Sequence, residues 1–303
     1  MTRRAANPDG PDGGLVVDKP AGITSHDIVA MARRALQQSR IGHTGTLDPL
    51  ATGVLPLLVG RATRLAQFLG ADRKTYEATV RFGFATSTYD AQGTPVGAIS
   101  AAAVDPARVE AALITFRGDV RQVPPAVSAK HVGGKRAYEL ARAEVAVALE
   151  PVDVTVHELE LLGWNGSETR LRVTASAGFY VRSLAHDLGQ VLGGGAHLTS
   201  LRRTLSGSFS LDGAVSAEML ATSPEAVRAH LRPMAALLPD LPLATVTADG
   251  LGRLKHGREL APAHLAGPVP ATTRHCRLVD PAGILMAVGE NRGGFLHPVV
   301  VLM

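Results

Sequence analysis

Cysteine and aromatic residues are scarce in this sequence: it has one cysteine, Cys276, and 4% Phe, Trp and Tyr among 303 residues. A single thiol excludes an intramolecular disulfide and a cysteine-based zinc site. A chain of this length buries enough apolar surface to fold without either cross-link. One thiol also agrees with a reducing compartment, so we expect a cytoplasmic protein.

Long apolar stretches are missing as well. No run approaches the roughly 18 apolar residues that a membrane-spanning helix needs, so we expect no membrane span. The N-terminal residues carry Arg3 and Arg4 with no apolar segment behind them, which excludes a secretory signal. They are rich in Asp, Pro and Gly, and we expect a disordered tail over 1–13.

The motifs of several cofactor sites are also absent. The sequence has no phosphate-loop signature, no dinucleotide-binding fingerprint and no His-Glu-x-x-His zinc motif. The three glycines at 193–195 follow a predicted helix rather than opening one, so we interpret them as its C-terminal stop. We therefore expect chemistry that depends on a carboxylate, with no cofactor and no metal.

The positive charge is small but unevenly spread. The formal net charge is +4, yet the stretch 117–142 and the stretch 170–203 each carry a net +4 of their own. Two basic stretches around a Gly-rich loop favour a polyanion over a small metabolite, and they indicate RNA as the partner.

Predicted helices and strands follow one another without regular strand–helix–strand spacing, which favours an α+β fold with a mixed or antiparallel sheet. Apolar periodicity and capping residues predict helices within 24–36, 62–69, 106–116, 181–191 and 224–237. Apolar runs predict strands near 14–20, 53–59, 75–82, 153–162, 169–176 and 204–210.

A Pro-Asp-Leu-Pro stretch at 239–242 indicates a boundary between two units. We expect a larger unit over 14–238 and a strand-rich unit over 243–303 that is long enough for a small β-barrel. The Pro-, Gly- and Lys-rich residues 123–136 predict a mobile hairpin that leads into a short helix, an insertion over about 123–150. Nothing indicates an obligate interface, and a monomer is expected.

The densest polar cluster is the loop 42–53, Gly-His-Thr-Gly-Thr-Leu-Asp-Pro-Leu-Ala-Thr-Gly. Its glycines permit a ligand to approach the backbone closely. Asp48 precedes Pro49, which keeps the Asp48 backbone out of the helical region and so fixes its carboxylate. The same residues are typical of an ordinary turn, and local sequence favours the two interpretations equally.

Two further clusters allow a functional and a structural interpretation. Arg182 falls in the first turn of a predicted helix, where a cation is unfavourable, so it requires an anionic partner unless it is an ordinary solvent-exposed arginine. At 72–76, basic residues run into Tyr76 at the start of a strand. This pattern is typical of sites that stack single-stranded bases, and equally of a strand core residue.

Four motifs, in order along residues 14–210, resemble the bacterial TruB-type tRNA pseudouridine synthases. They are Asp-Lys-Pro-Ala-Gly-Ile-Thr-Ser at 18–25, the loop 42–53, Lys-Thr-Tyr at 74–76, and Gly-Phe-Tyr-Val-Arg at 178–182 with Leu-Arg-Arg at 201–203. The resemblance implies a pseudouridine synthase catalytic domain followed by a PUA-like RNA-binding barrel. It also implies an isomerase that converts uridine to pseudouridine at position 55, in the TΨC loop of tRNA.

The resemblance also implies roles for three catalytic residues. Asp48 matches the essential aspartate, which acts on the ribose or on the base. Arg182 matches the arginine that pairs with it, and Tyr76 matches the aromatic residue that stacks on the target base and assists proton transfer at C5. The stretch 123–136 matches a thumb-like insertion over the RNA.

Substrate-binding residues follow from the same resemblance. Tyr180 and Leu201 match residues of the uracil pocket, and His43 matches a loop histidine that contacts the RNA. Lys19 matches a basic residue near the site, with a structural or a phosphate-binding role. Arg64 stands where many members have Lys, which keeps the charge but alters the hydrogen-bond geometry.

Other features leave alternatives open. Ala177 stands where a Lys is common, so one phosphate contact is expected to be missing, and the C-terminal stretch is a weaker match. A non-catalytic RNA-binding or RNA-folding protein would use the same basic surface without needing Asp48. A small-molecule hydrolase using Asp48 and His43 would leave both basic stretches unexplained.

Overall fold

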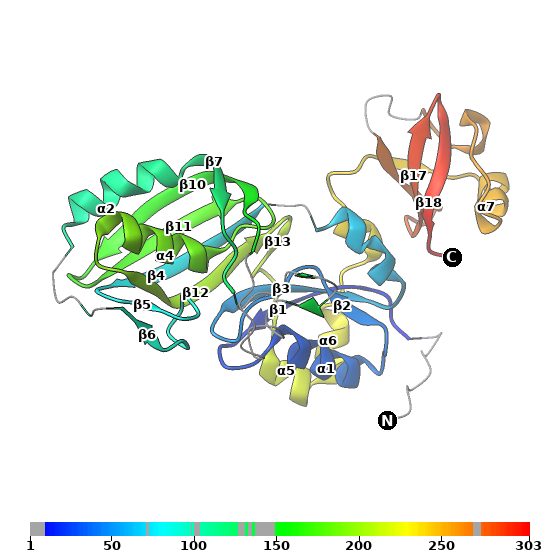
Figure 1. Ribbon diagram of the computed structural model, residues 1–303. Helices are drawn as coiled ribbons and strands as arrows, with labels where there is room; N and C mark the ends of the chain where they lie inside the picture. The colour runs from blue at the N-terminus through cyan, green and yellow to red at the C-terminus, as the bar shows by residue number, and fades with distance from the viewer. Residues whose placement is uncertain are drawn as a thin grey trace.

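The computed structural model describes residues 10–70, 73–97, 99, 104–126, 131–132, 135–136, 149–268 and 274–303, with the backbone alone at 131–132 and 135–136. Ten strands form one large sheet (Figure 1): β1 (Gly13–Lys19), β2 (Ile41–His43), β3 (Thr52–Val59), β4 (Lys74–Phe82), β7 (Gly118–Gln122), β10 (Val152–Trp164), β11 (Glu168–Ala175), β12 (Ala196–Ser206), β13 (Phe209–Ser210) and β14 (Val215–Ser216).

The sheet is mixed, and its two halves meet at β12. The order is β14-β1-β3-β12-β4-β11-β10-β7, with β2 beside β3 and β13 beside β12. β12 runs parallel to β3 and antiparallel to β4, and β1 runs parallel to β14. This confirms the predicted α+β fold with a mixed sheet. Because β12 borders both halves, its side chains reach residues that are far apart in sequence.

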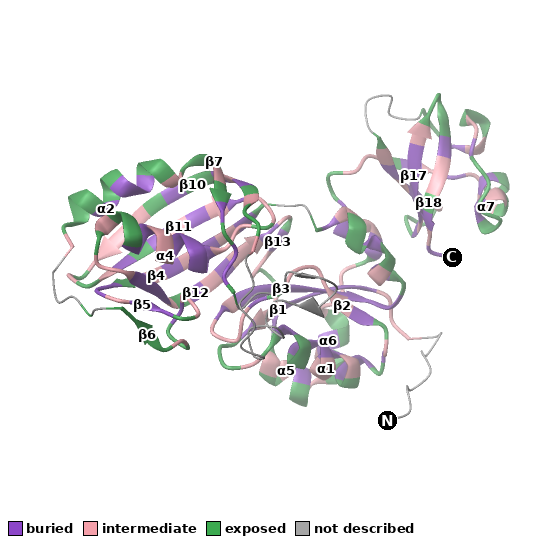
Figure 2. Ribbon diagram, in the orientation of Figure 1, coloured by how far each residue is buried: buried purple, intermediate pink, exposed green. Residues whose placement is uncertain are grey.

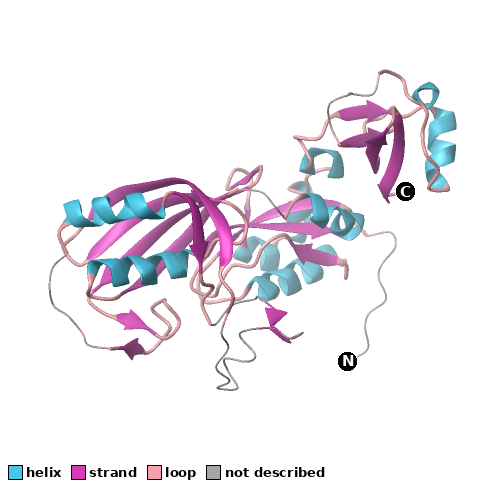
Figure 3. Ribbon diagram, turned by 45° about the horizontal axis from the view of Figure 1, so that its top comes forward, coloured by secondary structure: helices cyan, strands magenta, loops and turns pink. Residues whose placement is uncertain are grey.

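Helices cover each half separately (Figures 1 and 3). α1 (Ser25–Leu36), α5 (Ala217–Thr222) and α6 (Pro224–Ala229) pack together beside β1. α2 (Pro106–Leu113) and α4 (Val181–Leu192) pack against each other and against the half that contains β4, β10 and β12. The buried residues run along the strands and the inner helix faces (Figure 2).

α1 shows how local sequence defines a helix here. The Thr24 side chain accepts a hydrogen bond from the Asp27 backbone, and the Asp27 carboxylate accepts one from the Thr24 backbone, which forms a capping box. Ile28, Val29 and Ala32 are fully or almost fully buried, as the predicted apolar face requires. The helix therefore begins where its sequence predicts.

The C-terminal residues form a second, smaller sheet. Its strands are β15 (Leu243–Thr245), β16 (His275–Val279), β17 (Leu285–Arg292) and β18 (Phe295–Val301), in that order. Buried side chains on β17 and β18 share a hydrophobic cluster with Val54, Leu58 and Leu65 of the larger unit. In the described part of the chain β15 and β18 are the two edges, so the closed barrel stays a prediction.

Several predicted boundaries were wrong. The helix expected over 224–237 ends at Ala229, because Arg232 pairs with Gly14 through two backbone hydrogen bonds of 2.8 and 2.9 Å and Pro233 lacks a donor. The strand expected over 204–210 is the end of β12, which starts at Ala196, followed after a turn by the separate strand β13. The helix expected over 62–69 is a 3-10 helix, η1 (Gly60–Phe68).

Short elements were also missed. β2 overlaps the start of the loop expected over 42–53, and α7 (Ala248–Lys255) is a helix that was not predicted in the strand-rich C-terminal unit. These segments are too short for their patterns to stand out.

The two segments expected to be disordered or mobile are described only in part. Residues 1–9 lie outside the described residues, but Gly13 begins β1, and the Asp12 carboxylate accepts a hydrogen bond of 2.6 Å from the Arg61 backbone. The predicted hairpin exists as β8 (His131–Val132) paired with β9 (Lys135–Arg136). The short helix expected after it lies outside the described residues, as does most of 123–150. No helix in the described ranges is long and apolar enough to cross a membrane.

Candidate active site

The loop between β2 and β3 carries Asp48 and is fixed from behind by α1. The Ser25 hydroxyl donates to the Leu47 carbonyl over 2.9 Å and accepts from the Leu47 amide over 2.8 Å. The Ala51 amide donates to the Asp48 carbonyl over 3.0 Å and closes a turn. The loop is thus both a turn and a rigid mount for the Asp48 carboxylate.

Lys19 supports the same loop from the end of β1. Its Nζ donates to the carbonyls of Ala51 at 2.6 Å, Pro20 at 2.9 Å and Pro49 at 3.4 Å, and the residue is fully buried. Burial lowers the pKa of Lys19 to about 8, although the Asp48 carboxylate opposes this shift. The Lys19 ammonium therefore lies among backbone carbonyls beneath the loop.

Arg182, in the first turn of α4, meets two carboxylates. Its Nε lies 2.9 Å from Asp48 Oδ2, and its Nη1 lies 3.6 Å from Asp90 Oδ2. Nη1 also donates to the Thr88 carbonyl over 3.1 Å. Only 6% of the Arg182 side chain is exposed. The anionic partner predicted for a cation at this helix terminus is therefore present.

Asp90 is a member of this site that sequence analysis missed. It is 3% exposed and accepts from Thr88 Oγ1 over 2.6 Å and from the Gln92 amide over 3.0 Å. The only local signal is the polar stretch Thr-Ser-Thr-Tyr-Asp at 86–90, which is typical of any turn.

Burial and charge act in opposite directions on Asp48. Removal from water raises the pKa of the Asp48 carboxyl above its ordinary value, and the neighbouring Asp90 raises it further. The Arg182 guanidinium lowers it by charge and by its hydrogen bond. The net direction is upward, as expected for a carboxylate prepared for chemistry in a pocket.

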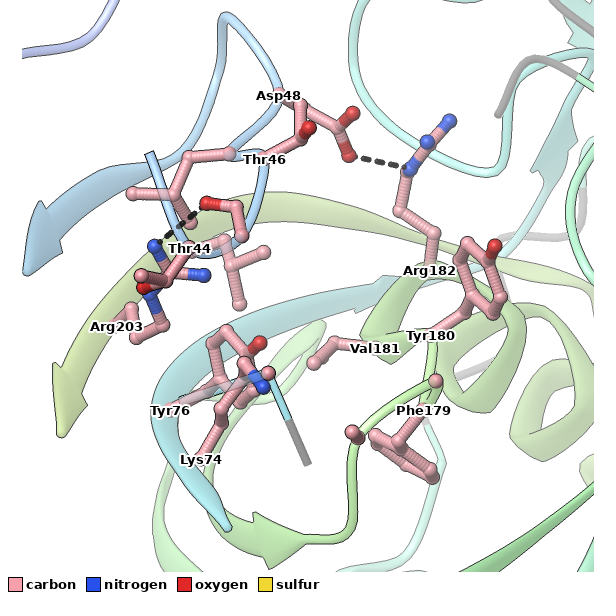
Figure 4. A pocket seen from close by; sticks show the side chains of 16 residues that line it. Thr44, Thr46, Asp48, Lys74, Tyr76, Phe179, Tyr180, Val181, Arg182 and Arg203 are labelled. Carbon is pink, nitrogen blue, oxygen red and sulfur yellow. Dashed lines mark hydrogen bonds and ion pairs between the residues drawn. The ribbon is translucent and has the colours of Figure 1, made fainter. Parts of the chain in front are cut away.

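Asp48 opens into a cavity of about 320 Å³. The cavity is lined by residues 44–48, 70, 74, 76, 177–182, 201 and 203. In Figure 4 Asp48 and Arg182 point toward each other across one side of it, while Tyr76 and Lys74 rise from β4 on the other. Of the eight residues singled out above, five line this one cavity: Asp48, Tyr76, Tyr180, Arg182 and Leu201.

Arg203 is a second residue that sequence analysis left without a role. Its Nε donates to the Val54 carbonyl over 2.7 Å, its Nη2 donates to the Gly45 carbonyl over 3.1 Å, and only 1% of it is exposed. It also hydrogen-bonds Tyr76, its cross-strand neighbour, which opposes the rise that burial causes in the pKa of the Tyr76 phenol. Arg203 therefore links the Asp48 loop to Tyr76.

Gln122, at the end of β7, fixes the start of α4. Its amide donates to the Tyr180 carbonyl over 2.9 Å and accepts from the Tyr180 amide over 2.7 Å. The Ser183 hydroxyl donates to the next carbonyl, that of Val123, over 2.7 Å. The helix that carries Arg182 is thus anchored where the 123–150 stretch begins.

The other three singled-out residues lie outside the cavity lining. His43 ends β2, next to the lining residue Thr44, and Lys19 lies beneath the loop. Arg64 lies on η1, where its Nη1 donates to the Val301 carbonyl of β18. The structure therefore places Arg64 at the junction with the C-terminal sheet.

The arginines of the basic stretch 170–203 divide between the site and the surface, where Arg170 is exposed and Arg172 and Arg202 are partly exposed. Arg182 and Arg203 are buried in the site. Arg172 pairs with Glu77 at 3.0 Å, and Arg202 pairs with Asp18 at 2.8 Å. Much of the other basic stretch, 117–142, lies outside the described residues.

The described residues show no group of three or more His, Cys, Asp or Glu that could hold a metal ion. The ionisable groups in the cavity lining are the Asp48 carboxylate, the guanidiniums of Arg182 and Arg203, the Lys74 ammonium and the phenols of Tyr76 and Tyr180. Together they can stabilise a developing positive charge and move a proton.

Comparisons with known proteins identify the family. Residues 33–181 match the TruB family pseudouridylate synthase N-terminal domain, and residues 182–239 match the tRNA pseudouridylate synthase B C-terminal domain. The tRNA pseudouridine synthase B of Solibacter usitatus is 47% identical over 294 residues, which is 96% of this chain and 100% of that protein. The chain belongs to the TruB family. It is therefore an isomerase of the pseudouridine synthase class.

A second relative agrees in sequence, and a solved structure agrees in fold. The tRNA pseudouridine synthase B of Thermobifida fusca is 43% identical over 299 residues, 96% of this chain and 98% of that one. A chain in the solved structure of an H/ACA RNP bound to a substrate RNA containing 2′-deoxyuridine is 25% identical, with a TM-score of 0.73, over 96% of this chain and 85% of that one.

Proposed function

We propose that this chain converts uridine to pseudouridine in tRNA, at position 55 of the TΨC loop. The observation that carries the proposal is the pair formed by Asp48 and Arg182 at the edge of a cavity that Tyr76 also lines. The relatives named as tRNA pseudouridine synthase B support tRNA as the substrate.

The reaction breaks the bond between N1 of uracil and C1′ of ribose, turns the base, and joins C5 to C1′. A proton leaves C5 and a proton is gained at N1, so the product is an isomer of the substrate. The Asp48 carboxylate stabilises the charge that develops at C1′ or removes a proton from the sugar or the base. Arg182 keeps this carboxylate ionised and oriented.

The target uridine has to leave its stack before Asp48 can reach C1′, at a cost of a few kcal/mol. In the proposed complex Tyr76 stacks on the extruded base and assists proton transfer at C5. Tyr180 and Leu201 form the sides of the uracil pocket, which fits their places in the cavity lining.

RNA binding extends beyond the cavity. We propose that His43 contacts the RNA loop beside the target, and that residues 243–303 act as a PUA-like RNA-binding unit in a monomer. Lys19 holds the Asp48 loop in place, and Arg64 holds β18 against η1. Both residues thereby support RNA binding without contacting the RNA themselves. No cofactor takes part in the proposed reaction.

The test is to map pseudouridine in an unmodified tRNA transcript after incubation with the protein. The matched control is the same transcript with cytidine at position 55. Product at position 55 of the first transcript and none in the control supports the proposal. Product at another uridine, or none at all, overturns the assignment of the site.

A further inference from the structure

Two aromatic rings stack beside the Arg182 site without reaching the cavity. The centroids of Tyr89 and His186 lie 3.9 Å apart, and the ring planes differ by 14°. Tyr89 lies in the turn between the paired strands β5 (Ala85–Thr86) and β6 (Pro95–Val96), and His186 lies on α4. Neither residue lines the cavity, so the proposed reaction assigns no role to either.

The stack joins the two segments that hold Arg182 and its acceptors. Tyr89 stands between Thr88 and Asp90, which lie 3.1 and 3.6 Å from Arg182 Nη1. His186 is four residues after Arg182 on α4, so the two side chains share one face of that helix. The ring contact therefore ties the turn that receives the guanidinium to the helix that supplies it.

Tyr89 occupies its position in an unfavourable backbone conformation. Its φ is +64°, in the left-handed region that glycine adopts readily and a bulky residue rarely adopts. Such a conformation persists only where the surroundings fix it. Here Thr86 Oγ1 donates to the Asp90 carbonyl over 2.7 Å, and the Leu198 amide donates to the Tyr89 carbonyl over 3.0 Å.

His186 contributes the face of its ring at this contact. Its Nδ1 is buried and makes no hydrogen bond with any residue that the structure describes. Burial lowers the pKa of the His186 imidazole and raises that of the Tyr89 phenol, so both rings are neutral near pH 7. A flat apolar ring would serve equally well at this position.

We propose that Tyr89 and His186 are positioning residues, whose stacked rings hold the turn 88–90 against α4 and thereby fix Arg182 and the Asp48 carboxylate. This inference rests on the proposed reaction, in which Asp48 performs the chemistry. A small displacement of a catalytic group costs up to about a hundredfold in rate. The stack therefore acts on turnover and leaves RNA binding unchanged.

The experiment measures kcat and KM for pseudouridine formation in a tRNA transcript, together with tRNA affinity and the melting temperature. His186→Ala and Tyr89→Gly each remove the stack, and Tyr89→Gly also relieves the unfavourable φ. His186→Phe keeps a ring at the contact. Gln190→Ala, one turn further along α4 and exposed, is the matched control.

We expect kcat to fall by about tenfold to a hundredfold in His186→Ala and in Tyr89→Gly. KM and tRNA affinity should stay within a factor of about two, and His186→Phe should restore turnover to near that of the wild type. The double variant should have a kcat no lower than that of the less active single variant, because both substitutions remove the same contact.

Three results would overturn the inference: wild-type kcat in Tyr89→Gly, weaker tRNA binding with unchanged kcat, or no recovery in His186→Phe. The second result would mean that the rings contact the RNA directly. If His186→Ala fails to fold, Tyr89→Gly alone still decides the question. Absence of product from the wild type would contradict the proposed function instead, so the two failures are distinguishable.

Discussion

The carboxylates of Asp48 and Asp90 both form ion pairs with the Arg182 guanidinium, whose Nε lies 2.9 Å from Asp48 and whose Nη1 lies 3.6 Å from Asp90. Both neighbours affect the ionisation of Asp48. Arg182 lowers the pKa of Asp48, whereas Asp90 and burial raise it. Removing Arg182 should therefore raise the pKa of Asp48, and removing the charge of Asp90 should lower it.

Substituting Arg182→Gln should raise the pKa of Asp48 further, because the carboxyl loses the positive charge and the hydrogen bond that Arg182 supplies. Activity should fall by about a hundredfold or more, and the acid limb of kcat/KM should move to higher pH. The measurement is the pH profile of kcat/KM. Arg202→Gln, whose partner Asp18 lies 2.8 Å away at the surface, is the control and should leave the profile in place.

Substituting Asp90→Asn should lower the pKa of Asp48, because a like charge is removed while the side chain keeps its shape. The acid limb of kcat/KM should then move to lower pH, opposite to the shift expected for Arg182→Gln. An acid limb that moves upward in Asp90→Asn would contradict the shared-guanidinium account.

Lys19 predicts a pH dependence of stability. Its pKa falls from 10.5 to about 8 on folding. Between these values the unfolded chain binds the proton that the folded chain has released, so this group makes stability rise with pH across that window, by roughly 3 kcal/mol in total. Lys19→Met should remove this rise. Urea unfolding at several pH values between 8 and 10.5 measures this rise in the free energy of unfolding. The prediction is contradicted if the free energy of unfolding rises equally with pH in the wild type and in Lys19→Met.

Substituting the buried Arg203 should lower the free energy of unfolding more than substituting a surface arginine does. Arg203→Gln leaves the carbonyls of Val54 and Gly45 buried without their donors, which should cost roughly 2–5 kcal/mol. Arg202→Gln should cost at most about 1 kcal/mol, since its ion pair is half exposed. Urea denaturation of the two variants compares adjacent residues on one strand, and equal losses would refute the role given to Arg203.

Sequence could predict the part of the site that follows from local physics. A cation in the first turn of a helix requires an anion, and Arg182 has one. A carboxylate before proline has a fixed backbone, and Asp48 lies on a rigid turn. The fold class and the start of α1 just after its Thr24 cap were predictable for the same reason, because caps and periodicity are local signals.

Sequence could not predict contacts that the sheet creates. Arg203 meets Gly45 and Tyr76 because β12 borders β3 and β4, and nothing near residue 203 shows this. Asp90 reaches Arg182 across 92 positions of the chain. The charge count of 170–203 could not show which of its arginines are buried in the site, because burial and pairing depend on the fold.

The most direct test of the account compares wild-type protein with Asp48→Asn on an unmodified tRNA transcript, following product and binding in parallel. We predict pseudouridine from the wild type alone, with tRNA affinity within a few-fold in both, because contacts with the RNA backbone dominate binding. Affinity should fall steeply with salt in both proteins. Pseudouridine formation by Asp48→Asn at the wild-type rate would contradict the central claim, since it would remove Asp48 from the chemistry.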